Sequence, residues 1–314
     1  MSTQKRMFVT GATGYIGRVV TEHALAEGYD VYGLSRNEEG DTKLRALGAT
    51  PVRGDLTSLD VLRRESAQAE VVLHLAYIHD FTMDYDEVLR VDAAAVDALG
   101  DGLRGTGKAL VITSGTAVVD PDPSGGETTE ESPLSKTFPL KDRIRSERNA
   151  LRLSEEGVRV SVIRLPPYVY GRAGSHFVPL LMQMAMNGGE SIYVDDGILR
   201  TSDVHVDDAA RLYLLAAREA KAGDVFNGTG STTVSLRELA EAIGAALKLP
   251  VRSVSREEAE ARWGPFLTAF VQFENRSSNV KAAQQLGWQP RELDMLTDIR
   301  SGSYIELADK LRSG

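Results

Sequence analysis

The stretch Val9–Gly17, which reads VTGATGYIG, decides the fold of this 314-residue chain. Its three glycines, Gly11, Gly14 and Gly17, follow a short apolar run and lead into a segment of helical period at residues 15–27. In such a turn one glycine permits the tight bend, one lets the backbone approach a pyrophosphate, and one lets helix and strand pack closely. The N-terminus of the helix then faces the anion. The order of strand, turn and helix therefore predicts a dinucleotide-binding unit.

Short runs rich in β-branched residues alternate with segments of helical period along the first half of the chain. Unbroken apolar runs of roughly 4–8 residues are typical of strands buried on both faces. Alternation of such strands with helices predicts an α/β fold with a doubly wound parallel sheet of the Rossmann type. The expected strands are Met7–Thr10, Val31–Leu34, Thr50–Arg53, Val71–Ala76, Ala109–Thr113 and Val158–Leu165.

The pattern changes after Leu165, where prolines interrupt it. A later helix is expected to begin at Ser235, because Glu238 three residues on completes a capping box. We expect a smaller C-terminal α+β domain that binds the substrate. The dinucleotide-binding domain is expected to comprise residues 1–165 and 204–228, and the substrate-binding cap residues 166–203 and 229–314.

The composition excludes several kinds of chemistry. No cysteine is present, which removes disulfides, thiolate nucleophiles and zinc–cysteine sites. The five histidines form no HxxxH pair, so no metal is expected. No GxSxG elbow supports a serine hydrolase. Hydroxyl, imidazole, carboxylate or cofactor chemistry remains.

The charge balance bears on partners and location. Lys and Arg number 36 against 45 Asp and Glu, for a net charge of −9, which gives no general attraction to nucleic acid or an anionic membrane. No apolar run approaches the ~20 residues that cross a bilayer. The first residues also lack a signal-peptide apolar region. We expect a cytoplasmic protein that acts on a small molecule, with no nucleic-acid or membrane partner.

The end of the second expected strand bears on which dinucleotide binds. An acidic residue there would hold a ribose 2′-hydroxyl, and a basic one a 2′-phosphate. The strand ends in Ser35 and Arg36, and no carboxylate follows before Glu38. Arg36 can pair with a phosphate and stack on adenine, and Ser35 can add a hydrogen bond. NADP(H) is therefore expected over NAD(H), the alternative being that Arg36 is a solvated loop charge.

Five further segments, together with VTGATGYIG, resemble the short-chain dehydrogenase/reductase superfamily in its extended form, the NAD-dependent epimerase/dehydratase type. The resemblance covers nearly the whole chain. It also implies a homodimer, formed through helices near residues 83–103 and 141–155. The segments are RGDLTS (Arg53–Ser58), HLA (His74–Ala76), RLPPYVYG (Arg164–Gly171), VHVDDAARLYLLA (Val204–Ala216) and LGWQP (Leu286–Pro290).

The resemblance implies a set of cofactor contacts at the carboxyl ends of the strands, where ligands bind in open α/β sheets. Two aspartates have a structural interpretation as an alternative to a functional one. Asp55 can be a turn residue, and Asp207 can be a helix cap. The expected cofactor-binding residues are Gly11, Thr13, Gly14, Tyr15, Ile16, Gly17, Ser35, Arg36, Asp55, Leu56, Leu75, Ala76, Tyr77, Thr113, Arg143, Pro166, Tyr168 and Val169.

The sequence departs from the family at its catalytic pair. Family chemistry uses a Tyr-xxx-Lys pair, in which the lysine charge lowers the pKa of the tyrosine. Aligned on Glu147, Pro139 stands for the tyrosine and Arg143 for the lysine. Proline has no proton to give. The chain therefore resembles an atypical subgroup without the usual catalytic residues.

Substitutes for the missing tyrosine follow two of the strands. His79 next to Asp80 has a side-chain pKa suited to acid–base work near neutrality, the alternative being an ordinary polar loop. Tyr168 could donate a phenol proton or be structural. The family also uses a Ser or Thr at the end of the fifth strand, where the nearest alignment places Gly115 with Ser114 and Thr116 on either side. The expected catalytic candidates are Ser114, Thr116, His79, Asp80 and Tyr168.

The expected substrate contacts lie in the loop after the fourth strand and in the C-terminal half: Phe81, His176, Phe177 and Arg200. Arg200 matches a family arginine that commonly pairs with a substrate phosphate. Four aromatic residues spaced three to four apart, Trp263, Phe266, Phe270 and Phe273, form a helical stripe that is either core or a roof over an apolar substrate.

Three functions remain open from sequence. The first is an NADPH-dependent oxidoreductase that reduces a carbonyl or imine-like carbon, since hydride transfer depends mainly on proximity and orientation. The second is an epimerase or dehydratase of the sugar-nucleotide type, against which the lost tyrosine counts. The third is a non-catalytic NADP-binding regulator or scaffold.

Overall fold

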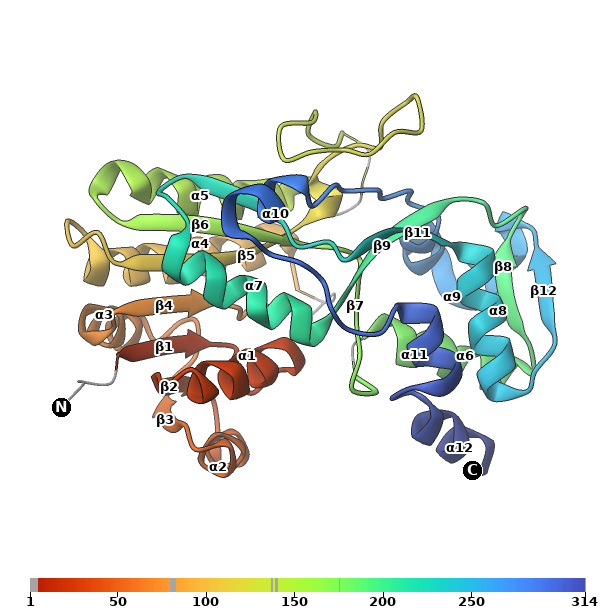
Figure 1. Cartoon of the computed structure of the whole chain (residues 1–314), viewed down its shortest axis with the longest axis horizontal. Coiled ribbons are helices and arrows are strands. Elements are labelled where there is room, and N and C mark those ends of the chain that lie inside the picture. The colour runs from red at the N-terminus through yellow and green to blue at the C-terminus, as the bar shows by residue number, and fades with distance from the viewer. Residues whose placement is uncertain (1–4, 80–82, 137, 139–140, 175, 314) are drawn as a thin grey trace.

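The computed structural model describes residues 5–79, 83–136, 138, 141–174 and 176–313 (Figure 1). Its centre is a seven-stranded sheet in the order β10-β6-β5-β4-β1-β2-β3, with every neighbouring pair parallel. The strands are β1 (Arg6–Thr10), β2 (Asp30–Ser35), β3 (Thr50–Arg53), β4 (Val71–His74), β5 (Ala109–Gly115), β6 (Arg159–Leu165) and β10 (Asp224–Asn227). The predicted parallel α/β sheet is confirmed, and each of the six strands whose bounds were predicted lies within about two residues of them.

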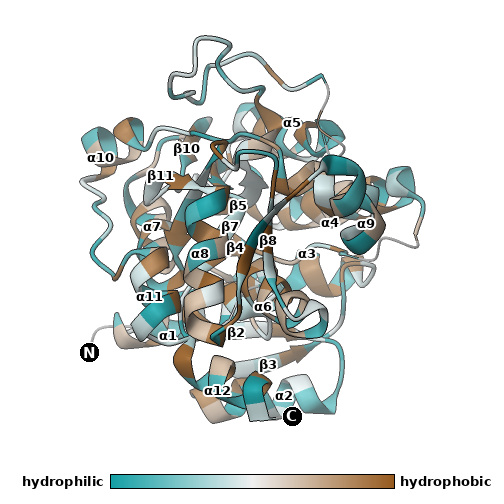
Figure 2. Cartoon of the chain, turned by 90° about the vertical axis from the view of Figure 1, so that its right-hand side faces the viewer, coloured by the Kyte–Doolittle hydropathy of each residue, from teal (hydrophilic) through white to brown (hydrophobic). Residues whose placement is uncertain are grey.

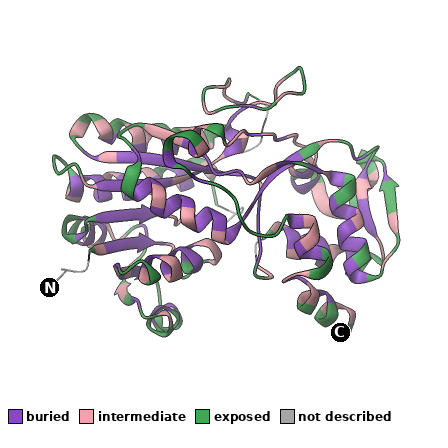
Figure 3. Cartoon of the chain, in the orientation of Figure 1, coloured by how far each residue is buried: buried purple, intermediate pink, exposed green. Residues whose placement is uncertain are grey.

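Helices cover both faces of this sheet, so the doubly wound arrangement is confirmed as well. One core packs α1 (Tyr15–Ala26) and α7 (Val206–Glu219) against the sheet. The other packs α3 (Leu59–Gln68), α4 (Tyr85–Leu103) and α5 (Ile144–Arg152) against its opposite face. The central strands are largely buried on both sides, and much of the exposed surface lies on outer helix turns and loops (Figure 3). The helix α2 (Glu38–Leu47) lies beside β3, and α10 (Val280–Leu286) beside β10.

A second group of elements, the cap, lies beyond the carboxyl ends of the strands (Figure 1). It holds a three-stranded sheet, β11-β9-β7, and a two-stranded sheet, β12-β8. Figure 2 looks at the molecule from this side. The cap strands are β7 (Tyr168–Tyr170), β8 (Ser191–Val194), β9 (Arg200–His205), β11 (Ser231–Ser235) and β12 (Val251–Val254), and its helices are α6 (Phe177–Gly188), α8 (Leu236–Leu247), α9 (Arg256–Val271), α11 (Met295–Ser301) and α12 (Ile305–Ser313).

Of two sequence predictions in the cap, the structure confirms the capping box and contradicts the continuous aromatic helix. The capping box at the start of α8 is confirmed, since the Ser235 and Glu238 side chains each bond the other's backbone N–H. The aromatic stripe does not lie on one continuous helix. Gly264, with φ of 79°, breaks α9 just before Pro265, and Phe273 lies beyond its end. Glycine has no Cβ to forbid a positive φ, and proline cannot continue the hydrogen-bond ladder.

Neither membrane-spanning nor metal-binding features were found in the described part of the chain. None of its helices is long and apolar enough to cross a membrane. Within the same residues, no group of three or more His, Asp or Glu side chains could hold a metal ion.

Asp203 in β9 gives the fold a pH dependence. This carboxyl is 2% exposed, and its Oδ2 has no hydrogen-bond partner in the described structure. Burial, together with the charge of Asp294, raises the pKa of Asp203 to about 8. The unfolded chain ionises this group near pH ~4. The folded state therefore loses stability as the pH rises from about 4 to about 8, by up to ~1.4 kcal/mol per pH unit.

Asp203→Asn is expected to remove that loss, because an amide does not ionise. Urea unfolding between pH 5 and 8 should show the variant gaining stability relative to the wild type as the pH rises. Asp60→Asn, at an exposed aspartate, is the control. A difference between Asp203→Asn and wild type that stays constant over this range would contradict the assignment of an uncharged Asp203.

Candidate functional site

The glycine turn after β1 leaves no room for side chains. Gly11 has φ of +72°, and a Cβ built on it would lie 2.7 Å from the backbone nitrogen of Ala76. A Cβ on Gly17 would lie 2.1 Å from the carbonyl oxygen of Gly11. The Gly14 N–H donates to that same carbonyl at 2.9 Å. The turn therefore closes tightly against the first turn of α1 and against the segment after β4.

The N-terminus of α1 starts in this turn. Its N-cap is Gly14, with no side-chain cap, and its first turn carries no acidic residue. Amide groups that a helix leaves unpaired at this end favour an anion. Thr13 is exposed beside the turn, and Ile16 packs against the core. The Tyr15 hydroxyl donates to the Gly171 carbonyl at 2.7 Å, so this predicted cofactor residue ties α1 to the segment after β7.

The ends of β2 and β3 hold the residues that bear on cofactor choice. Ser35 is buried, and its hydroxyl donates to the Asn37 carbonyl at 3.0 Å. Arg36 is exposed, and no ion pair or hydrogen bond of its side chain occurs among the described residues. Glu38 beside it pairs with Arg45 and Arg53.

Asp55 takes the turn role that its sequence allows. Its Oδ1 accepts the Thr57 N–H at 2.8 Å, the Thr57 hydroxyl at 2.7 Å and the Ser58 hydroxyl at 3.1 Å. These bonds hold the pKa of Asp55 below its usual range. All three go to one oxygen, so the exposed carboxylate keeps Oδ2 for a further partner. The next residue, Leu56, is buried in the core.

A hydrogen-bond chain fixes the segment after β4 beside the glycine turn. The buried His74 ring bonds Thr10 through Nδ1 at 2.8 Å, and the Thr10 hydroxyl accepts the Ala76 N–H at 3.2 Å. The Thr113 hydroxyl donates to the His74 carbonyl at 3.0 Å. Leu75 and Ala76 are half-buried at this edge. Sequence reasoning missed Thr10 and used His74 only as part of a motif.

Arg143 reaches the same edge from the short helical turn before α5. Its guanidinium carbon lies 3.3 Å from the ring centroid of Tyr77, and Nη2 donates to the Thr113 carbonyl at 3.0 Å. The His79 ring packs edge-on against Tyr77, with centroids 5.3 Å apart. Desolvation, followed by the charges of Arg143 and His176, lowers the pKa of His79. Three predicted site residues thus meet in one cluster.

Three catalytic candidates face inward instead. Thr116 is 1% exposed and donates to Asn275 Oδ1 at 2.9 Å. Ser114 is buried, with a hydroxyl that has no partner in the described structure. Tyr168 is 2% exposed, and burial raises its pKa. Asp80 lies outside the described residues.

The expected nicotinamide and substrate segments lie at the junction with the cap. Pro166 and Val169 are buried, while His176 and Arg200 are exposed. Phe177 stacks on Phe270, with ring centroids 4.1 Å apart and planes 16° apart. Phe81 and Pro139 lie outside the described residues.

An aromatic cluster, made of Phe138, Phe177, Phe270 and Phe273, forms around that stacked pair. Phe138 lies 4.5 Å from Phe273 and 6.2 Å from Phe270, centroid to centroid. Phe177, Phe270 and Phe273 each keep part of their surface exposed. Half-exposed aromatic rings beside a candidate site favour contact with an apolar group.

His205 caps α7, so the expectation that Asp207 is the cap was wrong. His205 Nδ1 accepts the Asp207 N–H at 3.2 Å. The Asp207 carboxylate instead bonds His23 at 2.8 Å and Arg172 at 2.6 Å. Burial alone would raise the pKa of Asp207, but these partners hold it well below its usual range.

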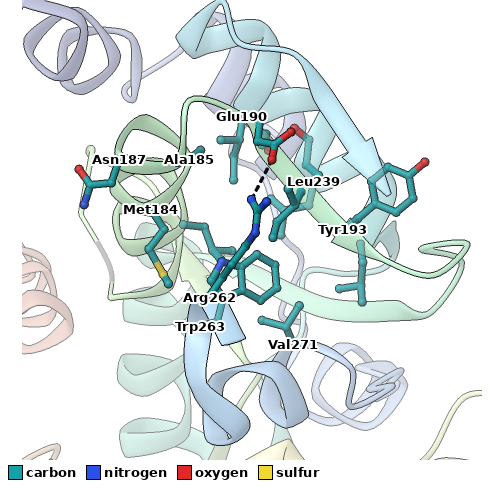
Figure 4. A pocket seen from close by; sticks show the side chains of 16 residues that line it. Met184, Ala185, Asn187, Glu190, Tyr193, Leu239, Arg262, Trp263 and Val271 are labelled. Carbon is teal, nitrogen blue, oxygen red and sulfur yellow. Dashed lines mark hydrogen bonds and ion pairs between the residues drawn. The ribbon is translucent and has the colours of Figure 1, made fainter. Parts of the chain in front are cut away.

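A cavity of about 390 Å³ lies inside the cap, between α6, β8, α8 and α9 (Figure 4). Apolar side chains such as Leu239 and Met184 line it, and the ion pair of Arg262 with Glu190, at 2.8 Å, lies beside it. Trp263, the first residue of the expected stripe, contributes a wall of this cavity and packs in the same apolar group as Phe177 and Phe270.

Known proteins resemble this chain in sequence and fold. The model of the NAD dependent epimerase/dehydratase family matches residues 7–227. The chain belongs to that family. An uncharacterized protein of Schizosaccharomyces pombe is 40% identical over 300 residues, which cover 96% of this chain and all of that protein. A 4-hydroxy-2-methyl-3-oxo-4-farnesyl-3,4-dihydroquinoline-1-oxide ketoreductase of Stigmatella aurantiaca is 30% identical over 74% of this chain and 70% of its own length.

Solved structures of the family match the fold. The UDP-glucose 4-epimerase of Thermotoga maritima superposes with a TM-score of 0.78 at 19% identity, over 97% of this chain and 99% of its own. The resemblance to epimerases and reductases predicted from sequence is thus confirmed for the family, whose members include both kinds of enzyme.

Proposed function

We propose that this protein is an NADPH-dependent oxidoreductase that reduces the carbonyl or imine-like carbon of a small molecule. The observation that carries the proposal is the meeting of the glycine turn with the Arg143–Tyr77 pair at one edge of the sheet. The N-terminus of α1 starts in this turn at Gly14, with no side-chain cap and no acidic residue in its first turn, as a pyrophosphate site requires. Bound NADPH would supply the hydride, while the residues of the edge orient the cofactor and the substrate carbon.

We propose that Arg36 selects the phosphorylated cofactor. Its side chain is exposed and has no partner among the described residues, so it can pair with a 2′-phosphate without first breaking an ion pair. Asp55 would contact the adenosine with its unused oxygen. In support of a dinucleotide at this edge, solved relatives include a MoeE5 complex that contains NAD.

Arg36→Ala is expected to weaken NADPH binding by roughly 10–100-fold, the worth of one charge-assisted hydrogen bond of about 1.5–3 kcal/mol. NADH binding should change little. Quenching of protein fluorescence measures both dissociation constants. Arg90→Ala, at an exposed arginine of α4 paired with Glu87, is the control. Equal effects on NADPH and NADH would contradict the assignment.

We also propose that the two parts of the chain bind different ligands. Residues 1–165 and 204–228 would bind the dinucleotide. This assignment is supported by the central sheet, all seven strands of which come from these residues. Residues 166–203 and 229–314 would bind the substrate. His176, Phe177 and Arg200 from this part lie exposed or half-exposed, as substrate contacts must.

The aromatic cluster and the relatives favour an apolar ketone as the substrate. The ketoreductase of Stigmatella aurantiaca acts on a farnesylated quinoline, and a further relative, 23% identical over 84% of this chain, is a 2-alkyl-3-oxoalkanoate reductase. Both names describe a carbonyl beside a hydrocarbon group. Stacked phenyl rings in this protein, Phe177 and Phe270, would accommodate such a group.

The experiment is a turnover assay of the purified chain with NADPH and a panel of aryl and cyclic ketones, permanent iminium ions and UDP-glucose. The proposal expects NADPH oxidation in equal amount to the alcohol or amine formed. Interconversion of UDP-glucose without net oxidation would instead identify an epimerase. Tight NADPH binding without turnover across the panel would identify a regulator or scaffold.

A further inference from the structure

We propose that the Tyr77 phenol donates the proton that completes carbonyl reduction, and that Arg143 holds Tyr77 in place by stacking on its ring. This inference rests on the proposed function. It assigns to Tyr77 the task that the family gives to the tyrosine of its Tyr-xxx-Lys pair. Alignment of the sequence on Glu147 puts Pro139 at the position of that tyrosine.

The position of Tyr77 suits that task. It directly follows Ala76, whose backbone nitrogen lies so close to Gly11 that a Cβ there would approach it to 2.7 Å. Arg143 lies 3.3 Å over the ring while its Nη2 is anchored to the Thr113 carbonyl, at the end of β5. Two adjacent parallel strands and one helical turn thus converge on this phenol. The ring is held at the carboxyl edge of the sheet, and its hydroxyl oxygen is buried there.

The surroundings of Tyr77 support a proton donor. Burial raises the pKa of Tyr77, so the phenol carries its proton at neutral pH, as a donor must. The charge of Arg143 and the neighbouring Tyr85 act in the opposite direction and stabilise the phenolate that donation leaves behind. Tyr85 in the first turn of α4 and His79 are both neighbours through which a proton can return to Tyr77.

Other hydroxyls at this edge fit the role less well. The Thr116 hydroxyl already donates a hydrogen bond to Asn275 Oδ1. Tyr168 is enclosed by the third core, which Val178 and Met182 help to form. Ser114 has an aliphatic hydroxyl, a far weaker acid than a phenol. The exposed His79 is neutral near pH 7, because its pKa is lowered. A neutral imidazole has only its single N–H to donate, which is a weak acid.

The proposed step balances. A hydride from NADPH forms the new C–H bond at the carbonyl carbon, and the C=O π pair moves to oxygen. That oxygen takes the phenolic proton of Tyr77, which gives the alcohol, NADP⁺ and a phenolate. One proton from solvent, passed through Tyr85 or His79, restores the phenol. A permanent iminium ion needs only the hydride, because its nitrogen becomes neutral without a proton.

This difference supplies a test that a structural defect cannot imitate. Tyr77→Phe keeps the ring beneath Arg143 and removes only the hydroxyl. Ketone reduction is expected to slow by roughly 100-fold or more, the usual worth of a positioned acid. Reduction of N-methyl-3,4-dihydroisoquinolinium and the dissociation constant of NADPH should stay within about threefold of wild type, well below the size of that effect. Tyr32→Phe is the matched control, since Arg6 lies 3.5 Å over the Tyr32 ring away from this edge.

Each outcome decides the matter. If the wild type reduces ketones and Tyr77→Phe reduces them equally fast, this inference is overturned and the proposed function stands. If Tyr77→Phe reduces the ketone and the iminium more slowly by the same factor and also binds NADPH more weakly, Tyr77 has a structural role. That result also overturns the inference. If the wild type reduces ketones and not the iminium, an unchanged NADPH affinity in the slowed variant supports the inference. A wild type that reduces neither removes both proposals.

Discussion

Gly17→Ala is expected to abolish dinucleotide binding. A Cβ at this position would lie 2.1 Å from the Gly11 carbonyl oxygen and 2.7 Å from its carbon, both backbone atoms that cannot move aside cheaply. The turn and the first turn of α1 must therefore separate, and the cradle for the pyrophosphate is lost. We expect the NADPH dissociation constant to rise at least ~100-fold, as a displacement of about 1 Å at a site can cause.

Isothermal titration with NADPH measures this effect, and circular dichroism shows whether the variant is folded. Gly188→Ala is the matched control, because a Cβ at this glycine of α6 meets nothing within 4 Å. The control should bind NADPH like the wild type. A folded Gly17→Ala that also bound NADPH with wild-type affinity would contradict the placement of the cofactor at this turn.

Arg164→Met is expected to destabilise the protein by ~3–5 kcal/mol, the usual cost of leaving one partner of a buried ion pair uncompensated. Arg164 in β6 is 4% exposed and Glu147 in α5 is 2% exposed. The guanidinium donates to both oxygens of Glu147, at 2.6 and 3.0 Å, and to the Glu130 carbonyl at 3.0 Å. This one side chain thus fastens α5 and the loop before it to the sheet.

The double variant Arg164→Met/Glu147→Met should recover most of that stability, since it leaves no buried charge. Arg152→Ala, which breaks an exposed pair with Glu156, should cost only ~0–1 kcal/mol. Urea unfolding measures all three. A loss below ~1 kcal/mol for Arg164→Met alone would show that the pair is not buried as described.

The fold was largely predictable because its signals are local. The glycine turn, the buried strand runs and the Ser235 capping box each depend on residues within a few positions of one another. The break in α9 was also visible as the Gly264–Pro265 pair, which should have divided the aromatic stripe. His205 was harder to foresee as a helix cap, because histidine is not among the preferred N-cap residues.

The candidate site was only partly predictable because its contacts join distant residues. Sequence reasoning placed Tyr77 and Arg143 in the site, but their separation along the chain concealed that the Arg143 guanidinium stacks on the Tyr77 ring. The same holds for Phe138 against Phe273, since no periodicity links them. The burial of Asp203 depends on packing in the cap and leaves no mark in the sequence.

The central claim is that this chain transfers a hydride from NADPH to an electrophilic carbon of a small molecule. Turnover of a reactive ketone with NADPH that carries deuterium at both C4 positions, followed by mass spectrometry of the product, tests this transfer. We expect one deuterium on the carbinol carbon of the alcohol for each NADPH oxidised. An alcohol without deuterium, or a cofactor returned unchanged after turnover, would contradict it.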